Sequence, residues 1–307
     1  MTKKLQTTRI FSQMKKIKLI FFGNEQLAQG IKASPIIFNT LQNSDQFEIC
    51  ALLLTNPNHR KPYAIEKAAK AANIPVYFSK NNDEITEIIK QYDADVAVLA
   101  SYGKIIPERI INAFPGGIIN IHPSLLPKYR GTTPIESALL NGDEETGVSV
   151  MRLVKAMDAG GILAQIKVKI TPETTKQSLY EELAQAGANA LINVLPGVVA
   201  NNASETPQDE AQASFTAQLD KSQSQLQPAL KTADTLSNEV RAFAGFPKSK
   251  AAFLDIPCVV TKAHVSDTPT TELDLQCEDG KYLIIDRLIP ENSKEMDATG
   301  FLNGHKK

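Results

Sequence analysis

The stretch Lys18-Leu-Ile-Phe-Phe22, which Gly23 and Asn24 follow, indicates the fold of the first half of this chain. It contains four consecutive apolar residues and ends at residues that favour turns. Such a run is typical of a strand buried on both faces, as in a parallel sheet covered by helices. We therefore expect an α/β layer to start here.

The same alternation of apolar runs and helical segments continues through the next hundred residues. Apolar runs predict further strands at 47–54, 75–78, 95–100 and 117–121. Spacing typical of helices covers 63–72, 83–91 and 107–113. The segment 25–41 also has helical spacing in places, but Pro35 is expected to break it. The alternation predicts an α/β fold with a mostly parallel sheet.

After residue 121 the pattern changes. A loop rich in proline and glycine covers 123–134, and a helix is predicted over 135–140. Strands are predicted over 147–151 and 162–170. A long helix is expected over 175–199, and Pro196 should kink or stop it.

The length of 307 residues favours two domains. Residues 200–216 are rich in Asn, Ala, Ser, Gln and acidic residues and form the best linker candidate. The elements predicted beyond the linker indicate a small β-barrel or sandwich. They are a helix at 235–242 and strands at 251–254, 258–263, 272–277 and 282–288. We therefore expect a first domain over 15–199 and a second over 217–307.

Residues 1–14 are expected to form a basic extension. The first 18 residues hold six Lys and Arg residues and no acidic residue. The apolar run that follows is too short for a secretory signal. An extension ahead of a natural start at Met14 is favoured over a transit peptide, because 13 residues are short for one.

The composition excludes several classes of protein. Lys and Arg number 33 against 34 Asp and Glu, so bulk charge does not bind this chain to nucleic acid. The three cysteines lack C-x-x-C spacing, which argues against a disulfide scaffold or a structural zinc site and fits a reducing compartment. No apolar run approaches the roughly 18 residues that cross a bilayer, so no membrane partner is expected.

Several common site motifs are absent from the sequence. Only Gly23 follows the first strand, so the G-x-G-x-x-G cradle for NAD or FAD is missing. The G-x-x-x-x-G-K-[ST] and G-x-S-x-G motifs are also absent. The four histidines are widely spaced, so we expect no metal site.

The residues that carry chemistry follow the strand predicted at 117–121. Asn120 and His122 lie two apart, so their side chains leave the same face of that strand. Ligands usually bind at the carboxyl ends of strands in an open α/β sheet. Downstream, Asp158 lies in a turn with Gly160 and Gly161, which allow close backbone approach.

Asn, His and Asp together suit acyl transfer from an amide or formamide to an amine. The Asn120 amide can stabilise the oxyanion of a tetrahedral intermediate. His122 can donate to that oxygen or move the proton of the attacking amine, and Asp158 can orient the His or accept a proton through water. A purely structural role stays open, because Asn often forms turns and His often bonds a backbone carbonyl.

Three blocks in this region resemble the signature of 10-formyltetrahydrofolate-dependent formyltransferases. They are Asn120-Ile-His-Pro-Ser-Leu-Leu-Pro-Lys-Tyr-Arg-Gly131, Thr146-Gly-Val148 and Asp158-Ala-Gly-Gly-Ile-Leu163. The whole chain from about Lys15 is most similar to the branch that formylates methionyl-tRNA. The segments 22–23, 101–107 and 207–217 are similar to that branch, and the weaker C-terminal matches at 241–247, 290–296 and 301–304 select it.

The resemblance implies a Rossmann-like formyl-folate domain followed by an OB-like barrel. It also implies that Asn120, His122 and Asp158 are catalytic and that 10-formyltetrahydrofolate is the co-substrate, without a metal. The residues implied to line the folate site are Ser124, Leu125, Leu126, Pro127 and Val154.

The activity that follows from the resemblance is formylation of the α-amine of methionyl initiator tRNA, for translation initiation. The amine would attack directly and pass through a tetrahedral intermediate. The alternatives are a formyltransferase for a small amine such as an amino-sugar nucleotide, a formyl-folate hydrolase, or a non-catalytic folate- or RNA-binding protein. We expect a cytoplasmic monomer of bacterial type, with an organelle matrix as the other location.

Two departures from the family concern the tRNA. The loop 56–62, which is usually longer and more basic, keeps only Arg60 and Lys61 as candidate tRNA contacts. Residues 217–307 hold 11 Lys and Arg against 13 Asp and Glu, a net charge of -2. Because neutralised phosphates supply most of the affinity for nucleic acid, we expect weak or altered tRNA docking, which the basic arm could offset.

Overall fold

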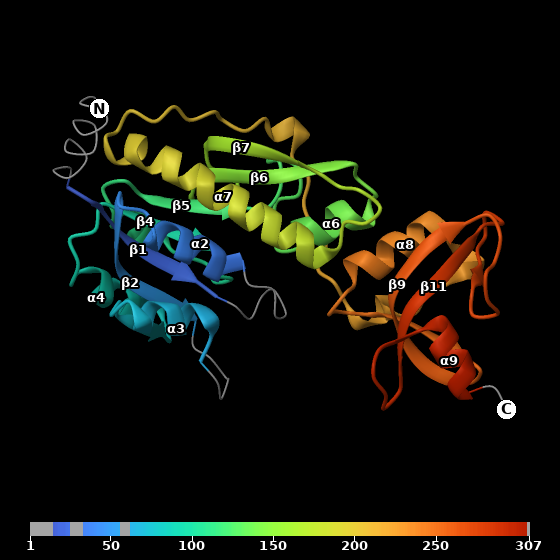
Figure 1. Ribbon diagram of the computed structural model, residues 1–307. Helices are drawn as coiled ribbons and strands as arrows, with labels where there is room; N and C mark the ends of the chain where they lie inside the picture. Colours follow the sequence, from blue (N-terminus) through green and yellow to red (C-terminus); the bar gives the residue numbers. More distant parts are fainter. Residues whose placement is uncertain (1–14, 25–32, 56–61, 306–307) are drawn as a thin grey trace, which may run out of the picture. The chain divides into compact units, whose positions relative to one another are not determined.

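The computed structural model describes residues 15–24, 33–55 and 62–305. The expectations placed on residues 1–14 and on Arg60 and Lys61 lie outside these ranges. The described chain forms two sheets with helices packed on them (Figure 1).

The first sheet has seven strands. In spatial order they are β3 (Val76–Ser79), β2 (Phe47–Thr55), β1 (Ile17–Gly23), β4 (Val96–Ala100), β5 (Ile118–His122), β6 (Glu145–Arg152) and β7 (Ile162–Lys169). The strands from β3 to β5 pair in parallel, whereas β6 runs antiparallel to β5. The prediction of a mostly parallel sheet is confirmed.

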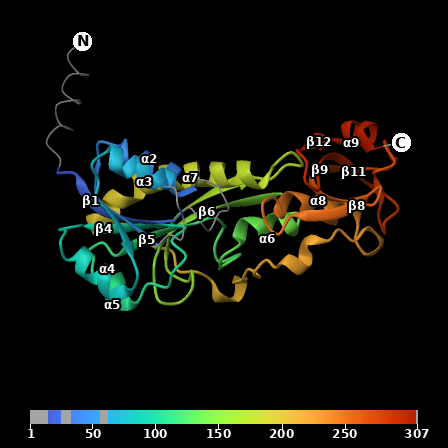
Figure 2. The same ribbon diagram turned by 90° about the horizontal axis from the view of Figure 1, so that it is seen from below.

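Helices cover both faces of this sheet (Figure 2). The helices are α2 (Ala33–Gln42), α3 (Ala64–Ala71), α4 (Asn82–Ile89), α5 (Glu108–Ile111) and α7 (Lys176–Val199). The short helix α6 (Pro134–Leu140) packs instead against α8 (Ala233–Ala242). α4 and α5 lie on one face, and α2, α3 and α7 lie on the other. Alternate side chains of β1 point to opposite faces of the sheet. Phe22 joins the core beneath α4 and α5. Phe21 packs on Phe38 of α2, and the centroids of the two rings are 5.5 Å apart.

The prediction that Pro35 breaks a helix is wrong, and so is the prediction that Pro196 could stop one. Pro35 lies in the first turn of α2, where a missing N–H costs no helical hydrogen bond, so the helix is not broken there. Pro196 lies inside α7, which continues to Val199, and its carbonyl still accepts a hydrogen bond from the amide of Ala200 at 3.0 Å. Buried Leu195 and Val198 hold this last turn against the core.

The second sheet is antiparallel and belongs to the C-terminal part of the chain. Its strands are β8 (Ser249–Phe253), β9 (Ile256–Ser266), β10 (Leu275–Gln276), β11 (Tyr282–Pro290) and β12 (Met296–Asp297). Their order is β10-β11-β9-β8, and β12 pairs with β11. Helices α8 (Ala233–Ala242) and α9 (Ala298–His305) pack on this sheet around buried Leu236 and Phe301. This small barrel-like domain agrees with the predicted fold class.

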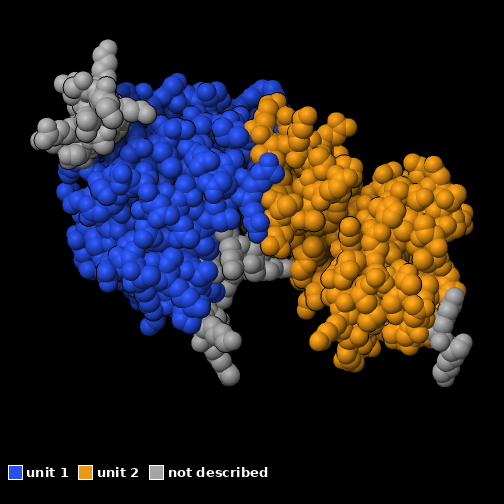
Figure 3. Space-filling view, viewed as in Figure 1, with its two compact units in different colours: residues 1–130, 147–166, 180–213 blue, residues 131–146, 167–179, 214–307 orange. Residues whose placement is uncertain are grey.

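The chain divides into two compact units, which Figure 3 shows in different colours. Unit 1 comprises 1–130, 147–166 and 180–213, and unit 2 comprises 131–146, 167–179 and 214–307. Both units are therefore discontinuous along the chain, and the sequential boundaries at 199 and 217 stay a prediction. None of the helices in the described ranges is long and apolar enough to span a membrane.

Candidate active site

Strand β5 presents Asn120 and His122 on one face of the first sheet. The neighbouring Ile121 points to the opposite face, where it packs closely against Gly187 of α7. Ile118, on the same face as Asn120, joins the core beneath α4 and α5. Only 6% of Asn120 and 4% of His122 is exposed, so both polar side chains are held in a nearly dry site at the strand's carboxyl end.

The two ring nitrogens of His122 have different partners. Nε2 donates a hydrogen bond to the main-chain carbonyl of Tyr129 at 2.8 Å. Because a carbonyl can only accept, this contact keeps the hydrogen on Nε2. Nδ1 faces the Oδ2 atom of Asp158 at 3.7 Å. Nδ1 is therefore the nitrogen that can take up or release a proton beside a carboxylate.

Asp158 occupies a tight turn between β6 and β7. Its backbone is left-handed, with φ +47, which is unfavourable for a residue other than glycine. Two residues later, a Cβ atom on Gly160 would lie 1.8 Å from the carbonyl oxygen of Arg152. The glycine is thus required for the turn to lie against β6, and this approach brings the Asp158 carboxylate to His122.

The Asn120 side chain is available as a donor. Within the part of the chain that the structure describes, its amide makes no hydrogen bond, although the residue is nearly buried. A buried amide without a protein partner can receive an oxyanion that develops next to it. Asn120 and His122 share a face, and His122 contacts Asp158, so the structure brings the three predicted catalytic residues into one region.

A hydrogen-bonded loop over 123–130 follows β5. The Ser149 hydroxyl lies at its centre, donating to the carbonyl of Ser124 at 2.7 Å and accepting from the amide of Leu126 at 3.1 Å. The side-chain amide of Gln165 donates to the carbonyl of Leu126 and to the Ser149 hydroxyl, both at 2.9 Å. The loop therefore has a defined path.

The five predicted folate residues differ in exposure. Ser124 and Leu126 are buried, and the Ser124 hydroxyl donates to the carbonyl of Lys128 at 2.6 Å. Leu125 and Pro127 are half-buried, and Val154 is 38% exposed. Ser124 and Leu126 thus anchor the loop from inside, and Leu125, Pro127 and Val154 keep side-chain surface that a ligand can reach.

Arg130 forms a network that the motifs did not reveal. Its side chain is only 3% exposed, and it donates to both carboxylate oxygens of Glu210, at 2.7 and 2.8 Å. This hydrogen bonding raises the pKa of the Arg130 guanidinium and lowers the pKa of the Glu210 carboxyl. Arg130 also donates to Oε1 of Gln208. Arg130 and Gln208 both lie in quoted motifs, but no spacing rule joins residues 78 positions apart.

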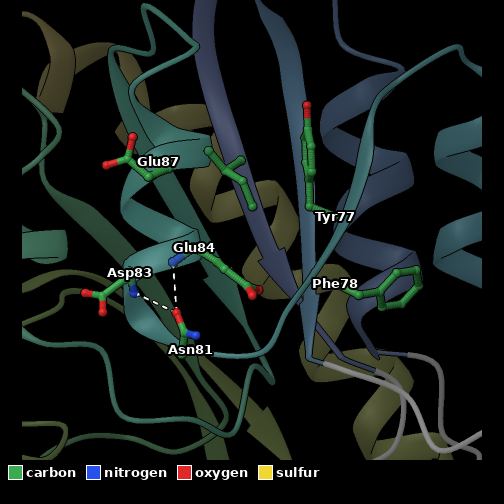
Figure 4. Close-up of a pocket in the computed structure, with 7 residues that line it drawn as sticks. Tyr77, Phe78, Asn81, Asp83, Glu84 and Glu87 are labelled. Carbon is green, nitrogen blue, oxygen red and sulfur yellow. Dashed lines mark hydrogen bonds between the residues drawn. The ribbon is translucent and has the colours of Figure 1, made fainter.

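The predicted tRNA contacts Arg60 and Lys61 lie outside the described residues. A hollow of about 560 Å³ lies between β3 and α4, far along the sheet from β5 (Figure 4). Asn81 lies at its edge and caps α4 by accepting from the amides of Asp83 and Glu84. Carboxylates on the lining repel anions, so this hollow does not suit the folate or the tRNA that the resemblance implies.

Comparison with protein families gives one match, which covers most of the first sheet. Residues 20–195 match the family described as Formyl transferase. A relative from Latilactobacillus sakei, named methionyl-tRNA formyltransferase, is 32% identical over 93% of this chain and 94% of its own length. A relative of the same name from Dictyoglomus thermophilum is 34% identical over 81% of this chain and 84% of its own.

Solved structures share the fold at lower identity. HypX from Aquifex aeolicus in complex with tetrahydrofolic acid gives a TM-score of 0.62 at 14% identity, covering 94% of this chain and 46% of that one. The sugar 3N-formyl transferase WlaRD gives 0.61 at 19% identity, covering 92% of this chain and 100% of that one. These two structural similarities show the fold of the chain and say nothing about its acceptor.

Proposed function

This chain belongs to the formyl transferase family, and on that basis we propose that it transfers the formyl group of 10-formyltetrahydrofolate to the α-amino group of methionyl initiator tRNA. The observation that carries the proposal is the extent of the match to relatives of that name, which reaches 93% of the chain. The product is the formylated methionyl-tRNA used in translation initiation.

The reaction is a direct acyl transfer. The amine nitrogen of the methionyl group forms a bond to the formyl carbon, and the formyl C=O becomes an oxyanion. The amine then loses a proton, the bond between N10 of the folate and the formyl carbon breaks, and N10 gains a proton. No covalent bond to the protein is needed, so the residues only stabilise charge and move protons.

Each catalytic residue has a role that its surroundings support. The amide of nearly buried Asn120, which makes no hydrogen bond to the residues that the structure describes, donates to the oxyanion. His122 holds a proton on Nε2 through Tyr129, and its Nδ1 exchanges a proton with the reacting groups. Asp158, 3.7 Å from Nδ1, stabilises the protonated ring when it forms.

The folate lies against the loop that follows β5. Leu125, Pro127 and Val154 offer apolar surface at its edge, and buried Ser124 and Leu126 hold the main chain in place. This arrangement suits a flat aromatic ring that must sit beside Asn120 and His122.

The tRNA acceptor offers phosphates in addition to its reacting amine. Arg60 and Lys61 are assigned to phosphate contacts, and the net charge of -2 over 217–307 leads us to expect weak affinity for the tRNA body. Because charged initiator tRNA is found where proteins are made, we place the enzyme in the cytoplasm, and we expect it to act as a monomer.

An acceptor panel tests the proposal. Purified protein and 10-formyltetrahydrofolate labelled in the formyl group are incubated separately with methionyl initiator tRNA, a methionyl elongator tRNA and an amino-sugar nucleotide. We expect label on the initiator tRNA at a rate well above either alternative. Label on the amino sugar alone would reject tRNA as the acceptor, and labelled formate without any acceptor would indicate a hydrolase.

A further inference from the structure

The segment 205–210, expected from sequence to be part of a linker, is bound along the turn that carries Asp158. Glu205 accepts from Nε of Arg152 at 2.6 Å. Thr206 and Ile162 exchange two backbone hydrogen bonds, at 2.8 and 2.9 Å. Glu210 pairs with Arg130 at the other end. We call this segment the strap, because it is tied at both ends and crosses the Asp158 turn.

Gln208, in the middle of the strap, uses its whole side-chain amide. Its Nε2 donates to the main-chain carbonyls of Asp158 at 2.7 Å and of Gly160 at 2.8 Å. Its Oε1 accepts from Nε and Nη2 of Arg130 at 3.1 and 2.8 Å. The position of residue 208 requires two N–H donors and one acceptor oxygen at the same time. Only a side-chain amide of this length supplies all three.

The network reaches the two groups that hold the catalytic histidine. Arg130 directly follows Tyr129, whose carbonyl accepts the hydrogen of His122 Nε2. Gln208 fixes the backbone of Asp158, whose carboxylate faces His122 Nδ1. A single buried guanidinium and one amide therefore connect the partners of both ring nitrogens.

We propose that Gln208 is a positioning residue for formyl transfer, holding the left-handed Asp158 turn so that the carboxylate faces Nδ1 of His122. A non-glycine residue at φ +47 persists only where its surroundings impose it, and two hydrogen bonds to adjacent carbonyls do so here. The inference rests on the proposed function, because the effect on rate is measured in that reaction.

The substitution Gln208→Met tests this role. Methionine has a similar length and volume but neither donates nor accepts at these positions. The strap keeps its ties at Glu205, Thr206 and Glu210, so it stays in place while the turn is released. We expect kcat to fall about tenfold to a hundredfold, as for a catalytic group displaced by about 1 Å, with the KM for 10-formyltetrahydrofolate within about twofold of wild type.

The matched control is Gln212→Met. Gln212 lies in the same part of the chain, and its Nε2 donates only to the exposed carboxylate of Asp209, at 2.9 Å. The control removes the same amide and is expected to keep the wild-type kcat. If Gln208→Met fails to fold, Gln208→Glu replaces it, because a carboxylate keeps the bond to Arg130 and loses both donors to the turn.

A second measurement separates positioning from general loss of stability. Nitrogen-15 spectra of the imidazole rings report the state of each nitrogen, and the His122 signals are assigned by their loss in His122→Gln. We expect the Nδ1 signal of His122 to shift in Gln208→Met and not in Gln212→Met, whereas Nε2 stays protonated in both.

The outcomes are distinct. A fall in kcat at constant KM, with a shifted Nδ1 signal, supports the inference. Unchanged kcat and an unchanged Nδ1 signal overturn it, and so does a loss of activity in proportion to a lower melting temperature with Nδ1 unmoved. A wild-type protein without transferase activity would reject the proposed function instead, and the Nδ1 signal would still test the geometry.

Discussion

The ring nitrogen Nε2 of His122 donates to the main-chain carbonyl of Tyr129 at 2.8 Å, and this bond decides which nitrogen can act in catalysis. Nε2 keeps its hydrogen throughout, since the carbonyl cannot give one back. Proton exchange therefore falls to Nδ1, which faces Asp158 at 3.7 Å. The ring of His122 thus makes the bond to a carbonyl that a structural role requires, and it leaves Nδ1 available for the catalytic role that we propose.

The substitution His122→Ala should abolish most of the transfer. Removal of a general acid–base group typically lowers rates by about 10²–10⁴-fold, and His122 is not among the residues assigned to the folate surface. The rate is measured with labelled formyl donor, and the folate affinity by titration of the protein. We expect the folate affinity to change less than about threefold. Wild-type rates in this variant would reject the mechanism.

Replacing Asn120 by Ala tests the oxyanion donor. The amide is nearly buried and is the group on β5 that can donate next to His122. Loss of one such donor typically lowers kcat by about 10²–10³-fold. Single-turnover rates at saturating folate and acceptor report this step directly. A loss confined to KM would instead assign Asn120 to substrate binding.

Gly160→Ala should disturb the Asp158 turn. Its Cβ would lie 1.8 Å from the carbonyl oxygen of Arg152, so β6 and the turn must separate. Overpacking of this kind costs about 1–3 kcal/mol of unfolding free energy, and kcat should fall as Asp158 moves. Chemical denaturation and steady-state kinetics measure the two effects.

The control for that substitution is Gly304→Ala in α9. A Cβ at Gly304 has nothing within 4 Å, and alanine favours helices over glycine by up to about 1 kcal/mol. We expect equal or higher stability and an unchanged kcat. Equal destabilisation by both substitutions would show that the close approach at Gly160 has no special cost.

The second domain should lose stability in acid through Asp274. Burial raises the pKa of this carboxyl, but hydrogen bonds from the backbone amides of Thr271, Ile285 and Thr270 outweigh burial and leave the pKa below its usual range. In the unfolded chain, an aspartate carboxyl takes up a proton near pH 3.9. The stabilisation is therefore complete above about pH 4 and is lost as the pH falls through the lower pKa of the folded state.

Asp274→Asn measures that contribution. At pH 7 the variant should be less stable by about 1–3 kcal/mol, because a carboxylate that accepts several hydrogen bonds is replaced by an amide with one acceptor oxygen. Urea denaturation at pH 7 and pH 3 shows whether the stabilisation by Asp274 falls or rises in acid. The gap between variant and wild type should narrow at pH 3, and a gap that widens in acid would contradict the assignment.

Local patterns predicted much of the first sheet and the face that carries the site. Apolar runs marked β1, β2, β4 and β5, and the two-residue spacing of Asn120 and His122 placed both on one face. The two prolines did not end their helices. Pro35 lies where a helix needs no N–H, and Pro196 is held by buried neighbours. Strand β12 and helix α9 were missed, since two residues form the strand and α9 contains two glycines.

Long-range relationships in the site could not be predicted from spacing. The bond between Arg130 and Gln208 joins residues 78 positions apart, and Asp158 faces His122 from a turn in which the Asp158 backbone is left-handed. Both depend on how β6 and β7 place the turn against the strap. The sequence contains these residues but does not reveal the geometry that bonds the strap to the Asp158 turn.

The stoichiometry of one reaction tests most directly whether the formyl group passes from the folate to the tRNA. Wild-type protein, 10-formyltetrahydrofolate and methionyl initiator tRNA are mixed, and tetrahydrofolate, formyl-methionyl-tRNA and formate are measured over time. We expect one formyl-methionyl-tRNA for each tetrahydrofolate and no formate. Release of tetrahydrofolate with an equal amount of formate and without formylated tRNA would contradict formyl transfer to the tRNA.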